Sequence, residues 1–272
     1  MSAATTAYPP IFVGGTGRSG TTILGHLIGA HPQVYCIPVE LKFHSAAVGL
    51  PGVVRGDVEL PAFLERMDYW WFHTLRNGAE RGIRGVWQSK REEFDRMLES
   101  FEAGFGRDRE QAARTLLAET LATALRRSGK PQLVEQTPTN VEEAVFLRRL
   151  YPECKVVHIR RDGRDVAASV TEQPWGPDDA ERAVRSWAER LAACEEQMRE
   201  IGDGLTIDFE SLFTEREETY ERLLSYLELE DAPEIRAYLE REVNLERANI
   251  GRWKQHAEAE EIDRLVSAAR SS

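Results

Sequence analysis

Near the start of the chain, an apolar run breaks into a glycine-rich turn that is followed by hydroxyl residues. The stretch reads Ile11-Phe12-Val13-Gly14-Gly15-Thr16-Gly17-Arg18-Ser19-Gly20-Thr21-Thr22. A strand that leads through such a turn into a helix points backbone N–H groups and the positive end of the helix dipole at one place, where an anion is stabilised. These residues therefore predict a phosphate-binding loop.

One position of this loop departs from the pattern of nucleoside triphosphate-binding proteins. The spacing from Gly15 to Gly20 fits G-x-x-x-x-G-K-[S/T], but Thr21 stands where that pattern has lysine. Because that lysine contacts the outer phosphates of a triphosphate, its absence argues against ATPase and kinase chemistry. The nearest cation is Arg18, whose planar guanidinium suits a 5'-phosphate that carries a further oxyanion group.

A second anion site is predicted at the end of a buried strand over residues 155–159. Arg160, Arg161 and Arg164 follow this strand, and Ser169 lies two turns into the next helix. We expect Arg161 and Ser169 to converge on one phosphate through charge-assisted bonds and a hydroxyl donor. The neighbouring aspartates would orient the arginines or stabilise the helix N-terminus. The alternative is a surface network of Arg/Asp salt bridges.

The elements that must position these residues alternate along the chain. We expect strands at 11–13, 34–37, 133–134, 155–159 and 205–208, and helices at 19–30, 110–127, 166–171, 178–200, 215–230, 232–242 and 258–269. A further helix around 145–150 is predicted to start at a capping box of Thr139 and Glu142. Such alternation predicts an α/β fold with a parallel sheet flanked by helices. Both anion-binding turns then lie at the carboxyl ends of strands, where such sheets bind ligands.

The segment from Leu41 to Arg109 is rich in Gly, Trp and Arg and has weak helical periodicity. We expect it to be an insertion of loops and helices that covers a site, because long irregular segments inside compact domains are usually functional. Its aromatic cluster at 69–73 either stacks on a flat or sugar acceptor or forms the core of the insertion. His158, which lies in an apolar strand, is expected to be a hydrogen-bonded core residue.

Composition and charge indicate a globular protein and disfavour several classes of partner. The 272 residues are 42% hydrophobic and carry a net charge of -11, which disfavours non-specific binding to nucleic acid or anionic membranes. The three cysteines, at 36, 154 and 194, suggest neither a disulfide framework nor a zinc site. No leader pattern and no apolar run of about 18 residues is present. We expect a soluble, cytoplasmic protein.

Four motifs in this order resemble those of sulfotransferases that use 3'-phosphoadenosine 5'-phosphosulfate (PAPS). The loop at 14–22, followed by Ala30-His31-Pro32, is similar to the family's 5'-phosphosulfate loop, most closely to that of tyrosylprotein sulfotransferases and their bacterial relatives. The stretch from Arg161 through Ser169 is similar to its 3'-phosphate motif. Residues 208–212 are similar to its Tyr-Glu-Asp-Leu stretch, and residues 247–254 to its late Gly-x-Trp-Lys loop.

The resemblance implies a single domain over residues 1–272 with the phosphate-loop sulfotransferase fold, similar to P-loop NTPases, in which 41–109 shapes the acceptor pocket. It implies in-line transfer of a sulfuryl group from PAPS, without a metal, to a hydroxyl of a small-molecule, carbohydrate or phenolic acceptor. Oligomeric state stays open. The residues that the resemblance assigns to the nucleotide are Gly17, Arg18, Ser19, Gly20, Thr21, Thr22, Arg161, Ser169, Arg247 and Gly251.

Three residues are the candidates for catalysis. Arg18 is expected to stabilise charge on the leaving phosphate. Glu40 is the expected general base, since it lies near the position of the family's catalytic glutamate, although the alignment with the tyrosylprotein branch is one residue out of step. His44 is the alternative base, because histidine titrates near neutrality.

Gln136 departs from the resemblance, because the family usually has a lysine there that is thought to assist the leaving group. Glutamine donates hydrogen bonds but brings no charge. Either another cation, such as Lys42 or Lys90 from the insertion, takes this role, or the protein holds the nucleotide without catalysis. A phosphate-loop kinase is the remaining alternative, and Thr21 opposes it.

Overall fold

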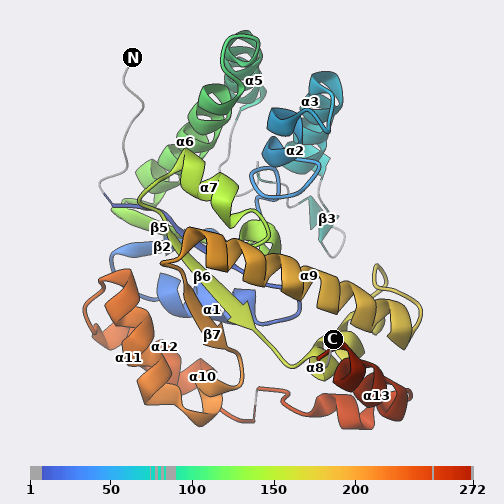
Figure 1. The fold of residues 1–272 in the computed structure, drawn as a ribbon. Coiled ribbons are helices and arrows are strands. Elements are labelled where there is room, and N and C mark those ends of the chain that lie inside the picture. The colour runs from blue at the N-terminus through green and yellow to red at the C-terminus, as the bar shows by residue number, and fades with distance from the viewer. Residues whose placement is uncertain are drawn as a thin grey trace.

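A five-stranded parallel sheet forms the centre of the protein in the computed structural model, which describes residues 8–270 except 74, 77–78, 81–82, 84–89 and 247 (Figure 1). Its spatial order is β2-β5-β1-β6-β7, and every pairing is parallel. The expected α/β fold with a parallel sheet is therefore confirmed. The strands are β1 (Ile11–Gly14), β2 (Val34–Cys36), β5 (Gln132–Glu135), β6 (Lys155–Arg160) and β7 (Leu205–Asp208).

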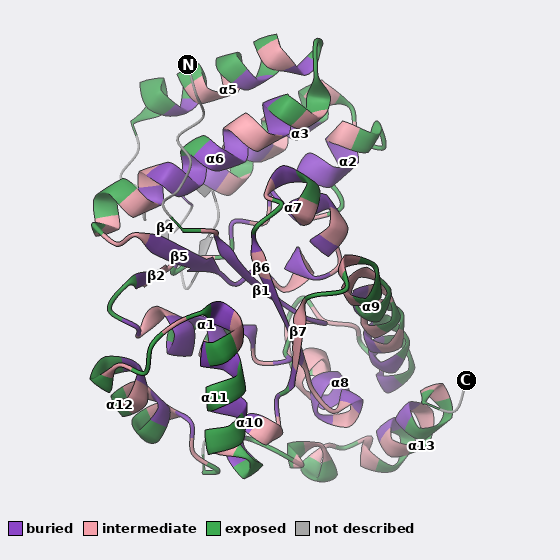
Figure 2. Cartoon of the chain, turned by 60° about the vertical axis from the view of Figure 1, so that its left-hand side comes forward, coloured by how far each residue is buried: buried purple, intermediate pink, exposed green. Residues whose placement is uncertain are grey.

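Helices cover both faces of this sheet, whose three central strands, β5, β1 and β6, are mostly buried between them (Figure 2). Alternate strand residues face opposite sides, so that Val13 and Val157 belong to one hydrophobic cluster while Phe12 and Val156 belong to the other. The first cluster lies under α1 (Thr21–Gly29), α10 (Ser211–Thr214), α11 (Arg216–Leu227) and α12 (Pro233–Glu242). The second lies under α6 (Arg109–Ser128), α7 (Ala144–Leu150) and α9 (Ala180–Ile201).

A third cluster lies beyond the end of β6. There α8 (Gly163–Thr171) packs with α9 and with the last helix, α13 (Ala259–Ala269). In Figure 1 the two shorter helices, α8 and α13, lie side by side near the C-terminus. The chain end is thereby held against the turn that follows β6.

The insertion at 41–109 is built onto the α6 side of the sheet. Its helices are α2 (Leu50–Arg55), α3 (Leu60–Asp68) and α5 (Arg91–Phe105), with a π-helical turn at Tyr69–His73 and a short antiparallel pair, β3 (Leu75–Arg76) and β4 (Ala79–Glu80). Trp71 and Phe72 are buried, and their rings lie 5.1 and 5.0 Å from that of Phe94 on α5. These two aromatic side chains therefore serve as core. The side chain of His73 lies outside the described residues.

The predicted capping box is wrong. Residues 138–140 form a 3₁₀ turn, and α7 begins only at Ala144. Thr139 shares a hydrogen bond with Ser45, and Glu142 accepts hydrogen bonds from Arg190 on α9. Both side chains are thus bound to distant segments, so neither caps the helix.

Burial determines the protonation state of the cysteine and histidine side chains in the core. The three cysteines are free, and burial raises the pKa of Cys36, Cys154 and Cys194 to about 12, so these thiols stay protonated at neutral pH. His158 is in the core, as expected, but neither ring nitrogen has a hydrogen-bond partner in the described chain. Burial lowers the pKa of His158 to about 4, which keeps the imidazole neutral.

Over the described residues, none of the helices combines the length and apolar character needed to cross a membrane.

Candidate functional site

The predicted phosphate loop connects β1 to α1. Gly20 precedes the helix with φ of +102°, and a Cβ there would lie 2.4 Å from Phe209, so that glycine is required. The N–H of Gly15 donates to the carbonyl of Pro138 at 2.8 Å, which fixes the start of the loop to the segment after β5. The first N–H groups of any helix lack partners within the helix. The start of α1 therefore offers the donors that an anion needs.

The hydroxyl residues of the loop differ in exposure. Ser19 and Thr21 are buried, whereas Thr22 is exposed. The Ser19 Oγ has no hydrogen-bond partner among the described residues, and a Cβ on Gly15 would lie 2.6 Å from it. An unpaired buried hydroxyl is unfavourable by about 1–3 kcal/mol. An anion oxygen at the loop would satisfy it.

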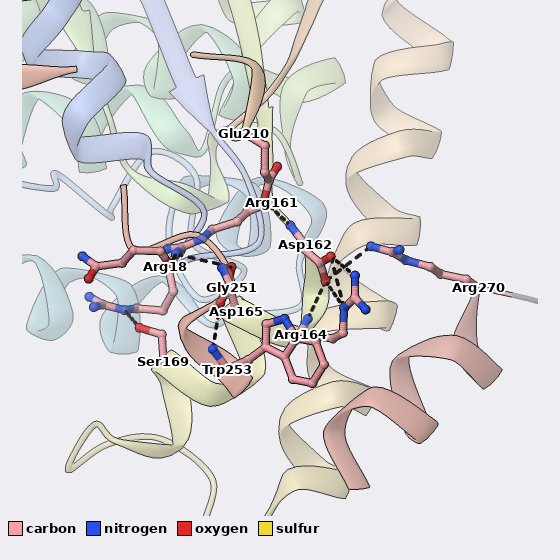
Figure 3. Close-up of polar contacts among 11 residues, drawn as sticks. Arg18, Arg161, Asp162, Arg164, Asp165, Ser169, Glu210, Gly251, Trp253 and Arg270 are labelled. Atoms are coloured by element: carbon pink, nitrogen blue, oxygen red, sulfur yellow. Dashed lines mark hydrogen bonds and ion pairs between the residues drawn. The ribbon is translucent and has the colours of Figure 1, made fainter. Parts of the chain in front are cut away.

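Arg18 joins the two predicted anion sites. Its backbone has φ of +52°, and its Nε donates to the Oγ of Ser169 on α8 at 2.9 Å. The guanidinium of Arg161 donates to the carbonyl oxygens of Arg18 at 3.1 Å and Asn249 at 2.9 Å. Figure 3 shows these side chains converging from the loop, from the end of β6 and from α8. The Nε of Arg18 thus reaches α8, so that this residue connects the phosphate loop to the second predicted site.

These residues line a cavity of about 200 Å³. Arg18, Arg161 and Ser169 bring two guanidinium groups and a hydroxyl to it, which is a donor set expected for a phosphate. Among the residues described, no cluster of three or more His, Cys, Asp or Glu side chains is arranged to hold a metal ion. The lining consists of Arg18, Arg161, Asp165, Ala168, Ser169, Glu172, Asn249, Arg252, Trp253, Gln255 and His256.

The guanidinium of Arg161 is held rigidly. Its side chain is 11% exposed and its Cζ lies 4.4 Å from the centre of the Phe209 ring. Burial lowers the pKa of Arg161, while Asp165, whose carboxylate is 3.9 Å away, opposes this shift. A fixed, charged fork of this kind loses little entropy when it binds an oxyanion.

Asp165 holds the late loop of the predicted nucleotide site. Its buried carboxylate accepts hydrogen bonds from the backbone N–H groups of Gly251 at 2.8 Å and Trp253 at 3.0 Å. Gly251 is therefore placed beside the cavity, whereas Arg247 lies outside the described residues. The sequence reasoning missed this role, because it assigned the aspartates to the arginines or to the helix end.

The salt-bridge alternative applies to the other arginines of this turn. Arg164 donates to Asp162 and to Asp263, and Arg160 donates to Asp208. Asp162 also caps α8 by accepting from the N–H of Arg164 at 2.9 Å. Arg161 is the residue of the three that lines the cavity, so the turn contains both an anion ligand and a structural network.

Glu40 lies at the same edge of the sheet, on the other side of the loop. The backbone N–H of Leu41 donates to Glu135 Oε1 at 3.1 Å, and that of Lys42 to Thr137 Oγ1 at 3.4 Å, which attaches this segment to the carboxyl end of β5. The Glu40 carboxylate is 40% exposed and lies 3.4 Å from the Lys42 ammonium. Because β5 is adjacent to β1, Glu40 is near the phosphate loop but outside the cavity lining.

His44 does not occupy a position suited to a general base for an external acceptor. The imidazole is fully buried against Phe12, and its Nε2 lies 2.7 Å from Asn140 Oδ1 and 3.2 Å from Glu135 Oε2. These contacts place it in a closed polar network beneath the surface. The structure therefore contradicts its assignment as the alternative base.

Glu135 is the centre of this network and was missed by the sequence reasoning. It is fully buried, and it accepts from Leu41, Thr137 and Asn140. Burial favours the neutral carboxyl, but His44 and these hydrogen bonds outweigh it and lower the pKa of Glu135. The sequence contains one indication of this network. Glu135 ends an apolar strand and is followed closely by the polar residues Thr137 and Asn140.

Gln136 packs against α1. Gln136 is 4% exposed, and its Nε2 donates to the Ile37 carbonyl at 3.5 Å. A Cβ added to Gly25 on α1 would lie 3.0 Å from the Cβ of Gln136. Its Oε1 has no hydrogen-bond partner in the described part of the chain. Of the two lysines proposed to compensate, Lys42 is next to Thr137, whereas Lys90 lies exposed at the start of α5.

Comparison with known proteins identifies the family that this chain resembles. Residues 9–233 match the model of the sulfotransferase family. The chain is 23% identical over 229 residues to protein-tyrosine sulfotransferase A of Caenorhabditis elegans and 24% identical over 230 residues to protein-tyrosine sulfotransferase of Drosophila melanogaster, each match covering 81% of this chain. It covers 50% and 38% of these two relatives, respectively, and thus spans half of their length or less.

Solved structures show the same fold. The sulfotransferase domain from the curacin biosynthetic pathway superposes with a TM-score of 0.57 at 17% sequence identity, over 85% of this chain and 77% of that domain. At this level of identity the likeness concerns the fold.

Proposed function

Because the chain belongs to the sulfotransferase family, we propose that it transfers a sulfuryl group from PAPS to a hydroxyl of an acceptor. The observation that carries this proposal is the convergence of Arg18, Arg161 and Ser169 on one cavity beside the phosphate loop. A nucleotide with phosphates at both its 5' and 3' positions needs two anion sites that lie close together. The loop and the cavity supply them.

Each end of the nucleotide has its own group of residues. Arg161 and Ser169 would hold the 3'-phosphate, since both line the cavity beyond β6. The backbone of the loop and the unpaired hydroxyl of Ser19 would hold the 5'-phosphosulfate. The late loop that Asp165 anchors would lie along the nucleotide between them.

Transfer would proceed in line, with the residues of β5 on the acceptor side. The acceptor oxygen forms a bond to sulfur while the bond from sulfur to the 5'-phosphate oxygen breaks, and Glu40 takes the acceptor proton. Arg18 and the loop N–H groups stabilise the charge that develops on the leaving phosphate. The sheet order places Glu40, the loop and the cavity in succession along one edge.

A different function, nucleotide binding without transfer, is favoured by one observation. Gln136 is neutral and buried where a cation would assist the leaving group. Incubation with ³⁵S-labelled PAPS and a panel of phenols, glycosides and tyrosine-containing peptides separates the two functions. Label transfer to any acceptor supports the enzyme, and tight binding of adenosine 3',5'-bisphosphate without transfer supports the binder. Preferential binding of ATP would contradict both.

The acceptor class is proposed to be a small molecule, a carbohydrate or a phenol, including the phenol of tyrosine. The names of the two matched relatives favour the phenolic class. Peptides and free phenols in the same panel distinguish a protein acceptor from a small one.

Replacing Glu40 with Gln is expected to lower kcat about a hundredfold, because the variant cannot accept the acceptor proton. Binding of adenosine 3',5'-bisphosphate should stay within about twofold of wild type, since Glu40 is outside the cavity lining. Steady-state kinetics and isothermal titration calorimetry measure the two quantities. Glu181→Gln, which changes an exposed glutamate on α9, is the matched control. An unchanged kcat in Glu40→Gln would remove Glu40 from the mechanism.

A further inference from the structure

Arg190 brings a second cation to the phosphate loop from helix α9. A Cβ on Gly17, at the tip of the loop, would lie 3.1 Å from the Nη1 of Arg190. Gly17 has φ of +79°, a conformation that favours glycine, and its lack of a side chain leaves room for the Arg190 guanidinium. The Arg190 side chain is 32% exposed and is therefore accessible to a ligand.

The guanidinium of Arg190 is oriented by a carboxylate. Its Nε and Nη2 donate to the same oxygen, Glu142 Oε1, at 2.8 and 2.5 Å. Its Nη1 makes no hydrogen bond to any part of the chain that the structure describes. Two of the three nitrogens are thus occupied, and the remaining one is directed at the loop.

Glu142 is itself attached to the loop. It follows the 138–141 segment, whose Pro138 carbonyl accepts from the Gly15 N–H at 2.8 Å. A Cβ on Gly14 would lie 2.6 Å from the backbone nitrogen of Val141, so this segment and the loop are in direct contact. The carboxylate that orients Arg190 is therefore fixed relative to the anion-binding residues.

In the described part of the chain, the phosphate loop has few other cations that could neutralise a bound 5'-phosphosulfate. The Nε of Arg18 is engaged with Ser169 on the cavity side, and Gln136 on the α1 side is neutral. A 5'-phosphosulfate carries negative charge on both of its acid groups. An additional pre-oriented cation beside Gly17 would stabilise this charge with little loss of side-chain entropy.

We propose that Arg190 is a ligand of the 5'-phosphosulfate group, with Nη1 donating to one of its oxygens and Glu142 as its positioning residue. This inference rests on the proposed function, because it takes PAPS as the nucleotide. It assigns the second cation to α9, in place of the lysines of the insertion.

The test compares two nucleotides that differ in the 5' group alone. Calorimetric titration of wild type, Arg190→Gln and Arg190→Lys uses adenosine 3',5'-bisphosphate and adenosine 3'-phosphate. We expect Arg190→Gln to lose about tenfold to a hundredfold in affinity for the bisphosphate, and to keep its affinity for the monophosphate within about twofold. Arg190→Lys should recover part of the loss. Arg185→Gln, five residues earlier on α9 and exposed, should match wild type for both nucleotides.

A loss confined to the bisphosphate locates the contact at the 5' group, because a general distortion of the loop or of α9 would weaken both nucleotides. Equal losses for both, or no loss for either, overturn the proposal. Glu142→Gln provides a second variant that keeps Arg190, and it should show a smaller loss with the same selectivity. If wild type itself does not bind the bisphosphate, the proposed function fails before any variant is compared.

Discussion

Replacing Arg18 with Ala is expected to reduce kcat/KM for sulfuryl transfer by about 10²–10³-fold. Arg18 contributes in two ways, since its guanidinium supplies positive charge beside the loop and its Nε joins the loop to Ser169 on α8. The carbonyl of the same residue accepts from Arg161, so the backbone of Arg18 also positions the cavity. Steady-state kinetics with labelled PAPS and the best acceptor of the panel measure the effect.

Two comparisons separate the contributions of Arg18. Arg18→Lys keeps the charge but lacks the Nε–H that donates to Ser169, so it should recover only part of the activity. Ser169→Ala removes the same hydrogen bond and keeps the guanidinium, and it should mainly weaken nucleotide binding. Arg182→Ala, at an exposed position on α9, should be unchanged. If Arg18→Ala keeps more than about a third of the wild-type kcat/KM, the assignment of a transition-state role to Arg18 is wrong.

The fold was predictable wherever a local pattern determines the structure. The short apolar runs that form β1, β6 and β7 end at a glycine, an arginine and an aspartate, respectively. The strand order, by contrast, depends on pairings such as that of Ile11 with Val134 and Lys155, which no local pattern encodes. The failed capping box has the same cause, because Glu142 binds Arg190 from a helix 48 residues away in sequence.

The site was predictable in its ligands but not in its assembly. Arg18, Arg161 and Ser169 were identified from residue type and spacing, yet their convergence depends on the direction of the Arg18 side chain. That direction follows from a left-handed backbone at Arg18 and from the packing of α8 beyond β6. Arg190 was not identified, since α9 carries many charges and the sequence does not indicate which of them faces the loop.

The sheet order explains how one edge can serve two substrates. The nucleotide residues follow β1 and β6, whereas Glu40 is attached to the end of β5, on the other side of β1. In the proposed function, the acceptor and the 3'-phosphate would lie at opposite ends of the edge, with the loop between them. The segment that carries Glu40 is attached to the buried network around Glu135. If Glu40 is the base, as we propose, this network supports activity as well as stability.

Replacing Glu135 with Gln is expected to lower the free energy of unfolding by about 3–5 kcal/mol, because it breaks a buried charged network and leaves donors without an acceptor. Leu41, Thr137 and Asn140 all donate to this carboxylate. Urea denaturation followed by circular dichroism measures the loss. Glu110→Gln, which alters an exposed ion pair with Arg149, is the control and should cost less than about 1 kcal/mol.

The predicted role of ionised Glu135 in stability can also be tested by measuring the free energy of unfolding as a function of pH. The pKa of Glu135 is lowered in the folded protein, so its ionised form is bound more strongly than in the unfolded chain, where the pKa is about 4.3. Its contribution is therefore complete above that value and is lost as the pH falls through the lower folded pKa. Wild type should lose stability more steeply than Glu135→Gln below about pH 4.3. If the free energies of unfolding of the two proteins fall in parallel below this pH, the carboxylate is not ionised in the native state. The network would then have to be held by a neutral Glu135.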